Sequence, residues 1–333
     1  MQDILTCAMG LDIHRDVIVA CLAKGELGTD PEIEIRSFST LIPEMRKLRD
    51  WVLEAECRYV AMESTGIYWQ PIYEMLEPCF DGQINILVVN ARHMKNVPGR
   101  KTDMRDAQWI ATLLRAGLLK GSFIPDKTFR ELRHLTRYRK SIVRDITAQK
   151  NRIDKFLQSS GFRFTAFLSD AFGASGRNII RHLMEYGNIS REALDRCLKT
   201  QTRKRIDEIL IALNGSLSEH QRGFLRMIFG HLEALEQHRH TVEDAITKEI
   251  TKHEEALSLL CSIPGIDVTA AAAIIAEIGT DMSAFPDSQH ICSWAGLSPG
   301  NNESAGKRKS AHINKGNPYL KSMLCEVGWV ISG

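Results

Sequence analysis

The chain has 333 residues, of which 44% are apolar and 25% are charged, and its formal net charge is +2. This composition is typical of an ordinary globular protein with enough chain for two or three domains. The longest apolar run, AAAAIIA at residues 270–276, is far too short to cross a bilayer, which excludes a membrane span of the usual kind.

Cysteine usage and the N-terminal sequence indicate the compartment. The eight cysteines occur singly, without a CxxC pair. We therefore expect no zinc site, and we expect free thiols in a reducing compartment. The opening MQDILTCAMGLD lacks the basic and then apolar pattern of a signal peptide. We therefore expect a cytoplasmic protein.

The charge is unevenly distributed. Residues 91–155 contain 17 Lys and Arg against 6 Asp and Glu, and a second basic cluster lies at residues 307–309. Basic blocks on a nearly neutral chain indicate a polyanionic partner, with nucleic acid the first candidate. A solvated helix face is the alternative.

The first 120 residues have the pattern of an α/β unit. Asp12 lies in a first strand, and further strands are expected at residues 17–23, 32–38, 59–64 and 84–90. Helical patterns cover residues 41–55 and 67–76 and a segment that begins near residue 103. The first three strands have connections short enough for hairpins, and the later ones have helical crossovers, so the sequence predicts a mixed sheet.

The last helix of this unit begins with the stretch GRKTDMRDAQ. Its apolar positions recur at helical spacing, and Thr102 is a plausible N-cap, which places Asp103 and Asp106 in the first turn. Residues 121–126 then have the composition of a linker.

Two long helical segments follow. Residues 129–157 are basic and helical, and residues 224–250 have apolar positions at roughly coiled-coil spacing. Residues 160–220 are mixed in pattern. We expect three domains, at residues 1–122, 123–256 and 257–333: an α/β domain, a helical coiled-coil arm for nucleic-acid binding and oligomerisation, and a small, mainly helical domain.

Four carboxylates suggest a metal site. Asp12 and Glu63 lie at the ends of apolar strands, and Asp103 and Asp106 open a helix. Buried acids repel one another unless a cation lies among them, and Mg²⁺ prefers such hard oxygen ligands. Two such ions, about 3.5–4 Å apart, can hold the attacking and leaving oxygens of a phosphoryl transfer. Turn residues and compensation of the helix dipole are the structural alternatives.

Long strings of the chain resemble one family. These are MGLDIHRDVIVACL, VAMESTGIYWQPIYEML, NARHMKNVPGRKTDMRDAQWIATLLRAGLL, RELRHLTRYRK and WAGLSPGNNESAGKRKS. They are similar to motifs of the DEDD transposases of bacterial insertion sequences, serine-dependent recombinases that work with a bridge RNA. The resemblance implies a ribonuclease H-like domain of the RuvC type, with Asp12, Glu63, Asp103 and Asp106 holding Mg²⁺ or Mn²⁺.

The resemblance also implies that Ser304 is a nucleophile that forms a phosphoserine link to DNA. A hydroxyl needs activation by a base or a metal, and Lys307, Arg308 and Lys309 are suited to hold the phosphate. Ser298 and Ser310 are rivals by position, and the family motif favours Ser304.

The implied partners are DNA, at the element ends and the target, a non-coding bridge RNA, and further copies of the chain in a dimer or tetramer. The candidate nucleic-acid contacts are Arg100, Lys101, Arg105, Arg137, Arg139, Lys140, Lys307, Arg308, Lys309 and Lys315. Relatives in this family usually continue past this point with a further basic helical tail, whereas the sequence here stops at EVGWVISG, so the activity of the chain as it stands is an open question.

Residues 261–279 resemble a helix-hairpin-helix, although Asp267 occupies the position of its usual second glycine. An ordinary helix connector is the alternative for this turn. For the whole chain, two other functions stay open. One is a RuvC-like nuclease that resolves branched DNA by hydrolysis, and the other is a non-catalytic RNA- or DNA-binding relic.

Overall fold

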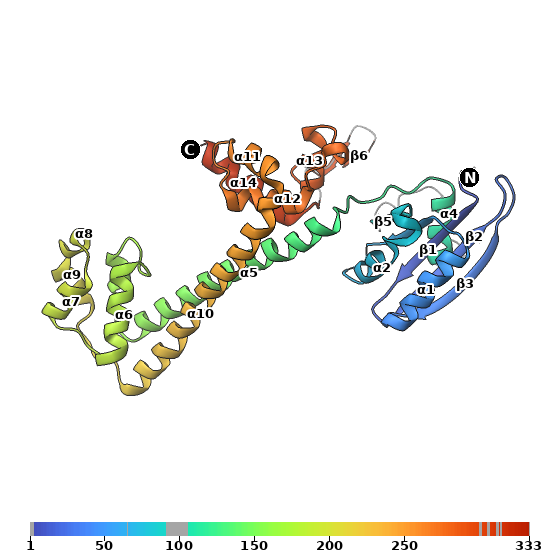
Figure 1. The fold of residues 1–333 in the computed structure, drawn as a ribbon. Helices are drawn as coiled ribbons and strands as arrows, with labels where there is room; N and C mark the ends of the chain where they lie inside the picture. The colour runs from blue at the N-terminus through green and yellow to red at the C-terminus, as the bar shows by residue number, and fades with distance from the viewer. Residues whose placement is uncertain are drawn as a thin grey trace. The chain divides into compact units, whose positions relative to one another are not determined.

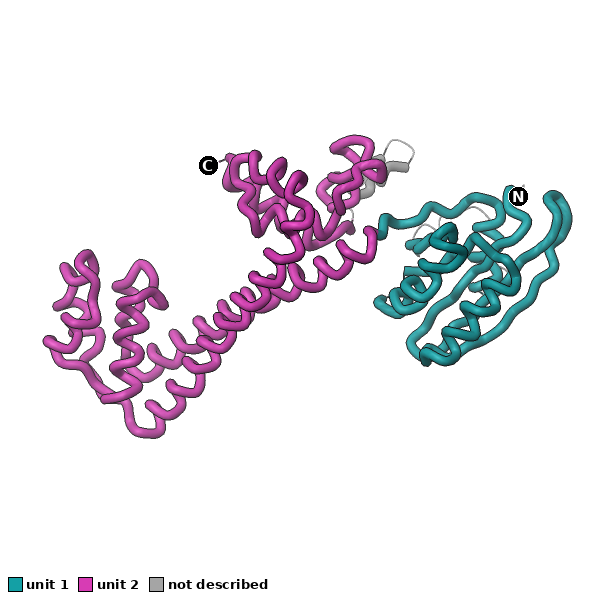
Figure 2. The backbone as a smooth tube through the Cα atoms, in the orientation of Figure 1, with its two compact units in different colours: residues 1–124 teal, residues 125–333 magenta. Residues whose placement is uncertain are grey.

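The computed structural model describes residues 3–64, 66–90, 106–299, 302–304, 307–310, 313 and 315–332. The chain folds as two compact units, Met1–Ile124 and Pro125–Gly333 (Figure 2). The second unit contains both the expected helical arm and the expected C-terminal region.

Unit 1 is built on a five-stranded mixed sheet (Figure 1). In chain order its elements are β1 (Cys7–Ile13), β2 (Val17–Lys24), β3 (Glu32–Ser39), α1 (Ile42–Glu54), β4 (Tyr59–Glu63), α2 (Trp69–Leu76), η1 (Cys79–Gly82), β5 (Asn85–Val89) and α4 (Asp106–Arg115). The strands lie in the order β3-β2-β1-β4-β5. β1, β2 and β3 pair antiparallel, whereas β4 pairs parallel with both β1 and β5. The predicted mixed sheet and its order of strands and helices are confirmed.

The two faces of the sheet are covered by different helices. Met9, Leu11 and Ile13 of β1 point into a core shared with α1 and α2. On the opposite face, small residues of β1 and β2 pack against α4; they include Ala8, Gly10, Cys21 and Ala23. Because side chains alternate along a strand, Asp12 lies on the α4 face together with Ala8 and Gly10.

Unit 2 is organised around two long helices, α5 (Lys127–Ser159) and α10 (Glu219–Ile250) (Figure 1). They pack antiparallel, since Arg139 contacts Glu243 near one end and Phe156 contacts Phe224 near the other. The two long helices predicted from the sequence are therefore confirmed.

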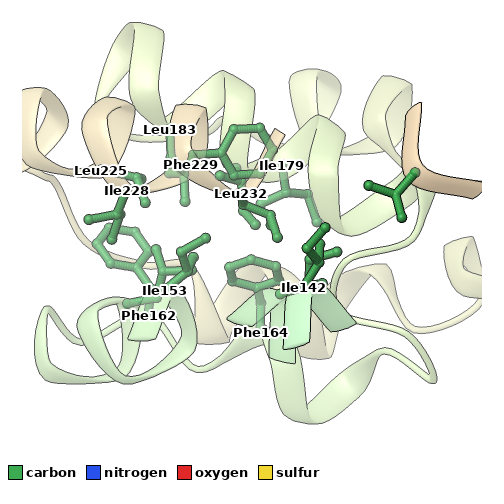
Figure 3. Close-up of a cluster of buried hydrophobic side chains, with 14 of the residues drawn as sticks. Ile142, Ile153, Phe162, Phe164, Ile179, Leu183, Leu225, Ile228, Phe229 and Leu232 are labelled. Atoms are coloured by element: carbon green, nitrogen blue, oxygen red, sulfur yellow. The ribbon is translucent and has the colours of Figure 1, made fainter. Parts of the chain in front are cut away.

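The segment between the long helices folds into short elements. These are η2 (Phe164–Phe167), α6 (Ala174–Tyr186), α7 (Arg191–Cys197), α8 (Thr200–Arg203) and α9 (Ile206–Ala212). Their apolar side chains, among them Phe164, Ile179 and Leu183, join Ile153 of α5 and Phe229 of α10 in one buried cluster (Figure 3). The short helices thus give α5 and α10 a buried apolar core that two helices packed together would not form alone.

The rest of the chain returns to the first half of α5. Its elements are η3 (Thr251–His253), α11 (Glu254–Cys261), α12 (Val268–Ile278), η4 (Met282–Ala284), α13 (Ser288–Ala295), β6 (Asn302–Ser304), β7 (Lys307–Ser310) and α14 (Pro318–Ser332). Ala272, Ile275 and Ala276 of α12 belong to the same buried cluster as Phe129 and Leu132 of α5. Within the described part of the chain, every helix is too short or too polar to cross a membrane.

Candidate active site

Two of the four predicted acids lie side by side at the ends of neighbouring strands. The parallel register of β1 and β4 pairs Leu11 with Met62, so the next residues along, Asp12 and Glu63, are adjacent. Neighbouring residues on paired strands point to the same face of the sheet. This is the face that carries α4.

The third acid reaches the same place through a close contact between β1 and α4. A Cβ atom on Gly10 would lie 2.2 Å from the carbonyl oxygen of Ala107 and 2.4 Å from the amide nitrogen of Ala111. Only glycine permits this approach of the helix backbone to the strand. Asp106 directly precedes Ala107, and Asp12 lies two residues beyond Gly10, so the contact brings these two acids together.

The other end of α4 is held by a buried arginine. Arg115 is 1% exposed and donates hydrogen bonds to the backbone oxygens of Leu5, Gly25 and Glu26, at 3.0, 3.2 and 2.7 Å. These bonds attach α4 to the segments at the outer ends of β1 and β2. The position of Asp106 is therefore set by contacts at both ends of its helix.

The pKa of Asp12 is affected by burial and by the other acids. Its side chain is 15% exposed, and burial raises its carboxyl pKa above the usual value. The negative charges of Asp106 and Glu63 raise this pKa further, while His14, whose Nε2 lies 3.2 Å from Oδ2 of Asp12, opposes the rise. Asp106 and Glu63 thus lie near enough to Asp12 to affect its ionisation.

The geometry of a complete metal site is not visible in the described residues. Within them, no group of three His, Cys, Asp or Glu side chains has an arrangement that could hold a metal ion. The fourth predicted acid, Asp103, lies outside the described residues, as do Arg100, Lys101 and Arg105.

Ser304 lies on a short hairpin of unit 2. It is the last residue of β6 and pairs with Lys307, the first residue of β7. The hairpin's flanks are joined by a bridge between Pro299 and Ile313. The backbones of Arg308 and Lys309 continue β7; Lys315 is exposed just beyond the hairpin.

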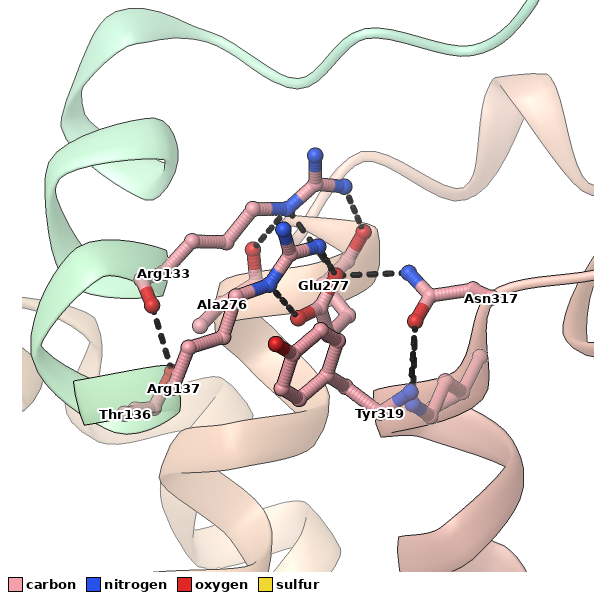
Figure 4. Close-up of polar contacts among 8 residues, drawn as sticks. Arg133, Thr136, Arg137, Ala276, Glu277, Asn317 and Tyr319 are labelled. Atoms are coloured by element: carbon pink, nitrogen blue, oxygen red, sulfur yellow. Dashed lines mark hydrogen bonds and ion pairs between the residues drawn. The ribbon is translucent and has the colours of Figure 1, made fainter. Parts of the chain in front are cut away.

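One predicted nucleic-acid contact, Arg137, is engaged within the protein (Figure 4). Its Nε and Nη2 lie 2.7 and 2.8 Å from the two carboxylate oxygens of Glu277, a residue of α12 that is only 2% exposed. Arg133 Nε lies 3.1 Å from the same carboxylate, and Asn317 Nδ2 donates to it at 2.6 Å. This network joins α5, α12 and the start of α14.

The other predicted arm cations differ in their surroundings. Arg139 forms an ion pair with Glu243 of α10 at 2.7 Å, so part of its charge is used between the long helices. Lys140 Nζ lies 5.8 Å from the centre of the Tyr319 ring. Arg139 is thus partly a structural residue, whereas Lys140 has no carboxylate partner in the described part of the chain.

The turn that resembles a helix-hairpin-helix has a clear local geometry. Gly265 has a φ of 83° between α11 and α12, and the carboxylate of Asp267 accepts a hydrogen bond of 2.7 Å from the amide of Ala270. Asp267 is therefore the N-cap of α12. A phosphate at this helix N-terminus would have to displace a carboxylate.

Two family models match the chain. Residues 9–161 match the DEDD transposase model of the IS110 group, and residues 257–332 match the model described as transposase IS116/IS110/IS902 family. The chain belongs to the IS110 family of transposases. The first match contains the four candidate acids of this transposase, and the second contains Ser304.

Two curated relatives show the same affiliation. The chain is 22% identical over 233 residues to the putative transposase y4qE of Sinorhizobium fredii, a match that covers 69% of this chain and 47% of the relative. It is 28% identical over 248 residues to the insertion element IS110 uncharacterized 43.6 kDa protein of Streptomyces coelicolor, covering 68% of this chain and 60% of the relative. The chain thus spans about half to three-fifths of the length of these relatives.

Two features of this IS110-family transposase were missed by sequence reasoning. Glu277 lies in an apolar helix, VTAAAAIIAEI, where a lone acid indicates a buried partner. The contribution of Gly10 depends on the approach of α4, for which the sequence has no local signal.

Proposed function

We propose that this chain is a DNA-cutting and DNA-rejoining transposase of the RuvC type, with a divalent-metal site on unit 1 and a nucleophilic serine on unit 2. The observation that carries the proposal is the convergence of Asp12, Glu63 and Asp106, through the register of β1 with β4 and the contact of Gly10 with Ala107. Burial and the negative charges of Asp106 and Glu63 also raise the pKa of Asp12. Acids kept together against their own repulsion are typical of a cation site.

The donor set fits a hard divalent cation such as Mg²⁺ or Mn²⁺. Asp12, Glu63 and Asp106, with Asp103 as the proposed fourth ligand, offer only carboxylate oxygens, which these ions prefer. When bound, the metal supplies Lewis-acid polarisation of a DNA phosphate. His14 Nε2 lies 3.2 Å from Oδ2 of Asp12, a contact suited to orient that carboxylate.

In the proposed reaction, the hydroxyl oxygen of Ser304 attacks the scissile phosphorus. A bond forms between Ser304 and phosphorus, and the bond from phosphorus to the 3′-oxygen breaks. The serine proton is lost to solvent and the 3′-oxygen takes up a proton, leaving a 3′-hydroxyl. The phosphoserine link retains the energy of the phosphodiester, so rejoining needs no ATP, and the sequence contains no GxxxxGK[ST] loop.

The proposed partners are DNA, a bridge RNA and further copies of the chain. The basic strand β7, with Lys307, Arg308 and Lys309, pairs with β6, which ends at Ser304, and this suits it to hold the phosphate under attack. Lys140 and Lys315 are proposed nucleic-acid contacts as well, and Arg100, Lys101 and Arg105 surround the proposed metal ligands in the sequence. A guide RNA would read the target by base pairing, so the protein itself needs to recognise only shape and backbone.

A denaturing-gel assay for a covalent protein–DNA adduct tests this function. It uses the element's own end sequence, its flanking non-coding RNA and Mg²⁺, and compares the unchanged chain with Ser304→Ala and Asp12→Ala. We expect an adduct that both substitutions abolish. Ser298→Ala is the matched control and should leave the adduct intact.

Two other outcomes would overturn the proposal. Cleavage without an adduct, unaffected by Ser304→Ala, would identify a hydrolytic junction nuclease. Binding of RNA or DNA with no metal-dependent cleavage would identify a non-catalytic relic.

A further inference from the structure

A hollow lies in unit 2 where four helices meet. Its volume is about 270 Å³, and residues of α5, α10, α12 and α14 line it. Aliphatic parts of Val143, Ile246, Ala273 and Met323 form much of its surface. The volume is just below the roughly 300–1,000 Å³ of pockets for drug-sized ligands, so it fits one small group.

The rim of the hollow is basic and carries an aromatic ring. Lys140 and Arg144 line it from α5, and Tyr319 lines it from α14. The guanidinium of Arg137 lies 4.4 Å from the centre of the Tyr319 ring, so a planar cation and an aromatic ring are held together at the edge. Such a pair is suited to contact a flat, polarisable group.

Two of the rim cations have no ion-pair partner within the described ranges. Arg137 is paired with Glu277, and Arg139 is paired with Glu243. By contrast, neither Lys140 nor Arg144 forms an ion pair within the described ranges.

The cations that line this hollow outnumber its acids. The acids are Glu277, which is buried and accepts bonds from two arginines and an asparagine, and Glu326, which is exposed and accepts a hydrogen bond from Ser322 at 3.0 Å. The cations are Arg137, Arg139, Lys140 and Arg144, so the lining keeps an excess of positive charge for an anion outside the chain.

We propose that this hollow binds one unpaired nucleotide of a bound strand. The base enters the aliphatic hollow beside Tyr319, and Lys140 and Arg144 bind its flanking phosphate. The combination of a small apolar hollow, an aromatic ring and two uncommitted cations matches a nucleotide, which presents a flat ring and an anion close together. A purely apolar occupant would leave the two cations without a role. The inference rests on the proposed function, because it presumes a nucleic-acid partner.

Binding of a fluorescein-labelled single-stranded oligonucleotide to the full chain tests the inference. The same oligonucleotide annealed to its complement is the second probe. Ala273→Phe fills the hollow without altering any charge. We expect this variant to bind the single strand about ten-fold more weakly and the duplex unchanged, because a lost base contact costs about this much. The double substitution of Lys140→Ala and Arg144→Ala should likewise weaken binding of the single strand more than binding of the duplex. Lys155→Ala, which removes an exposed α5 cation outside the hollow, is the matched control and should bind as the unchanged chain does.

A second measurement does not depend on the substituted chains being folded. A strand containing 5-bromouracil is photo-crosslinked to the unchanged chain, and the modified peptide is identified by mass spectrometry. We expect crosslinks on the α14 peptide with Tyr319 and Met323. Crosslinks confined to other peptides, or an equal loss of both probes in folded Ala273→Phe protein, would overturn the inference. Dissociation of an oligomer by Ala273→Phe with unchanged strand binding would also overturn it and would assign the hollow to a second copy.

Failure of the inference and failure of the proposed function give different results. Ser304→Ala should retain the preference for the single strand, because Ser304 is not part of the hollow. If no adduct forms but binding depends on the hollow, the serine chemistry is wrong and the nucleotide site stands. Absence of any strand binding would overturn both.

Discussion

Gly10 on β1 and Ala107 on α4 are in backbone contact, with no room for a side chain between them: a Cβ atom at position 10 would lie 2.2 Å from the Ala107 carbonyl oxygen. This contact sets the distance between the strand that carries Asp12 and the helix that begins with Asp106. The proposed metal site therefore depends on a residue that has no functional group.

Gly10→Ala should separate the two acids. The added methyl group must displace α4 or bend β1, and overpacking of this kind typically costs about 1–3 kcal/mol. We expect a lower free energy of unfolding and a loss of the thermal stabilisation by Mg²⁺, both measured by thermal denaturation with and without the ion. Gly230→Ala is the control, because position 230 of α10 has open space for a Cβ atom, and this change should stabilise the helix by up to about 1 kcal/mol. A fully retained Mg²⁺ effect in Gly10→Ala would contradict the positioning role.

Lowering the pH should weaken the stabilisation by Mg²⁺. The folded-state pKa of Asp12 is raised, so without metal the folded protein binds this proton more readily than the unfolded chain does. The contribution of Asp12 to metal-free stability is thus present at low pH and is lost as the pH rises through its folded-state pKa. Mg²⁺ needs the ionised form, so its stabilising effect should grow with pH over the same range.

Asp12→Asn provides the matching variant for this pH dependence. It keeps the size of the side chain and removes one of the mutually repelling charges. We expect metal-free protein that is at least as stable as the unchanged chain and a melting temperature that no longer responds to Mg²⁺. A pH-independent Mg²⁺ effect in the unchanged chain, or one that persists in Asp12→Asn, would show that the ion binds elsewhere.

Glu277→Ala should destabilise unit 2 strongly. Glu277 is buried, and its removal leaves Arg133 and Arg137 without their carboxylate; breaking one side of a buried ion pair typically costs about 3–5 kcal/mol. Chemical denaturation measures the difference. Glu233→Ala removes the partner of Arg181 in an exposed pair and should cost at most about 1 kcal/mol. Equal effects of the two substitutions would show that the Glu277 network is not a major source of stability.

Arg137→Ala should affect stability and Lys140→Ala should affect strand binding, although both remove a cation from the same part of α5. Arg137→Ala should lower stability, because its guanidinium binds Glu277 through two hydrogen bonds. Lys140→Ala should leave stability unchanged, weaken strand binding and reduce the slope of log affinity against log salt by about 1. Chemical denaturation and salt-dependent binding of both variants measure these effects. A loss of stability in Lys140→Ala would contradict the role of Lys140 as a nucleic-acid contact.

Several parts of the fold followed from local patterns. Alternating and continuous apolar runs predicted the strands and helices of unit 1 in their order. Helical spacing predicted long helices at residues 129–157 and 224–250, which the structure extends to 127–159 and 219–250. Residues 160–220 had no clear pattern, yet they contain α6 to α9. These are short helices that depend on burial against α5 and α10, such as that of Ile179 and Leu183, more than on their own periodicity.

Residue types and their spacing predicted which residues would carry the proposed chemistry: acids at strand ends, a serine before a basic run, and cations along a helix. Which of these residues meet depends on the tertiary structure. Asp12, Glu63 and Asp106 come together through the parallel register of β1 and β4 and the approach of α4 to Gly10, and Arg137 is engaged by an acid 140 positions later. Residue type and spacing are local properties of the chain, whereas register and helix packing are set by the burial of whole surfaces against one another, so charges distant in sequence acquire their partners only when the core forms.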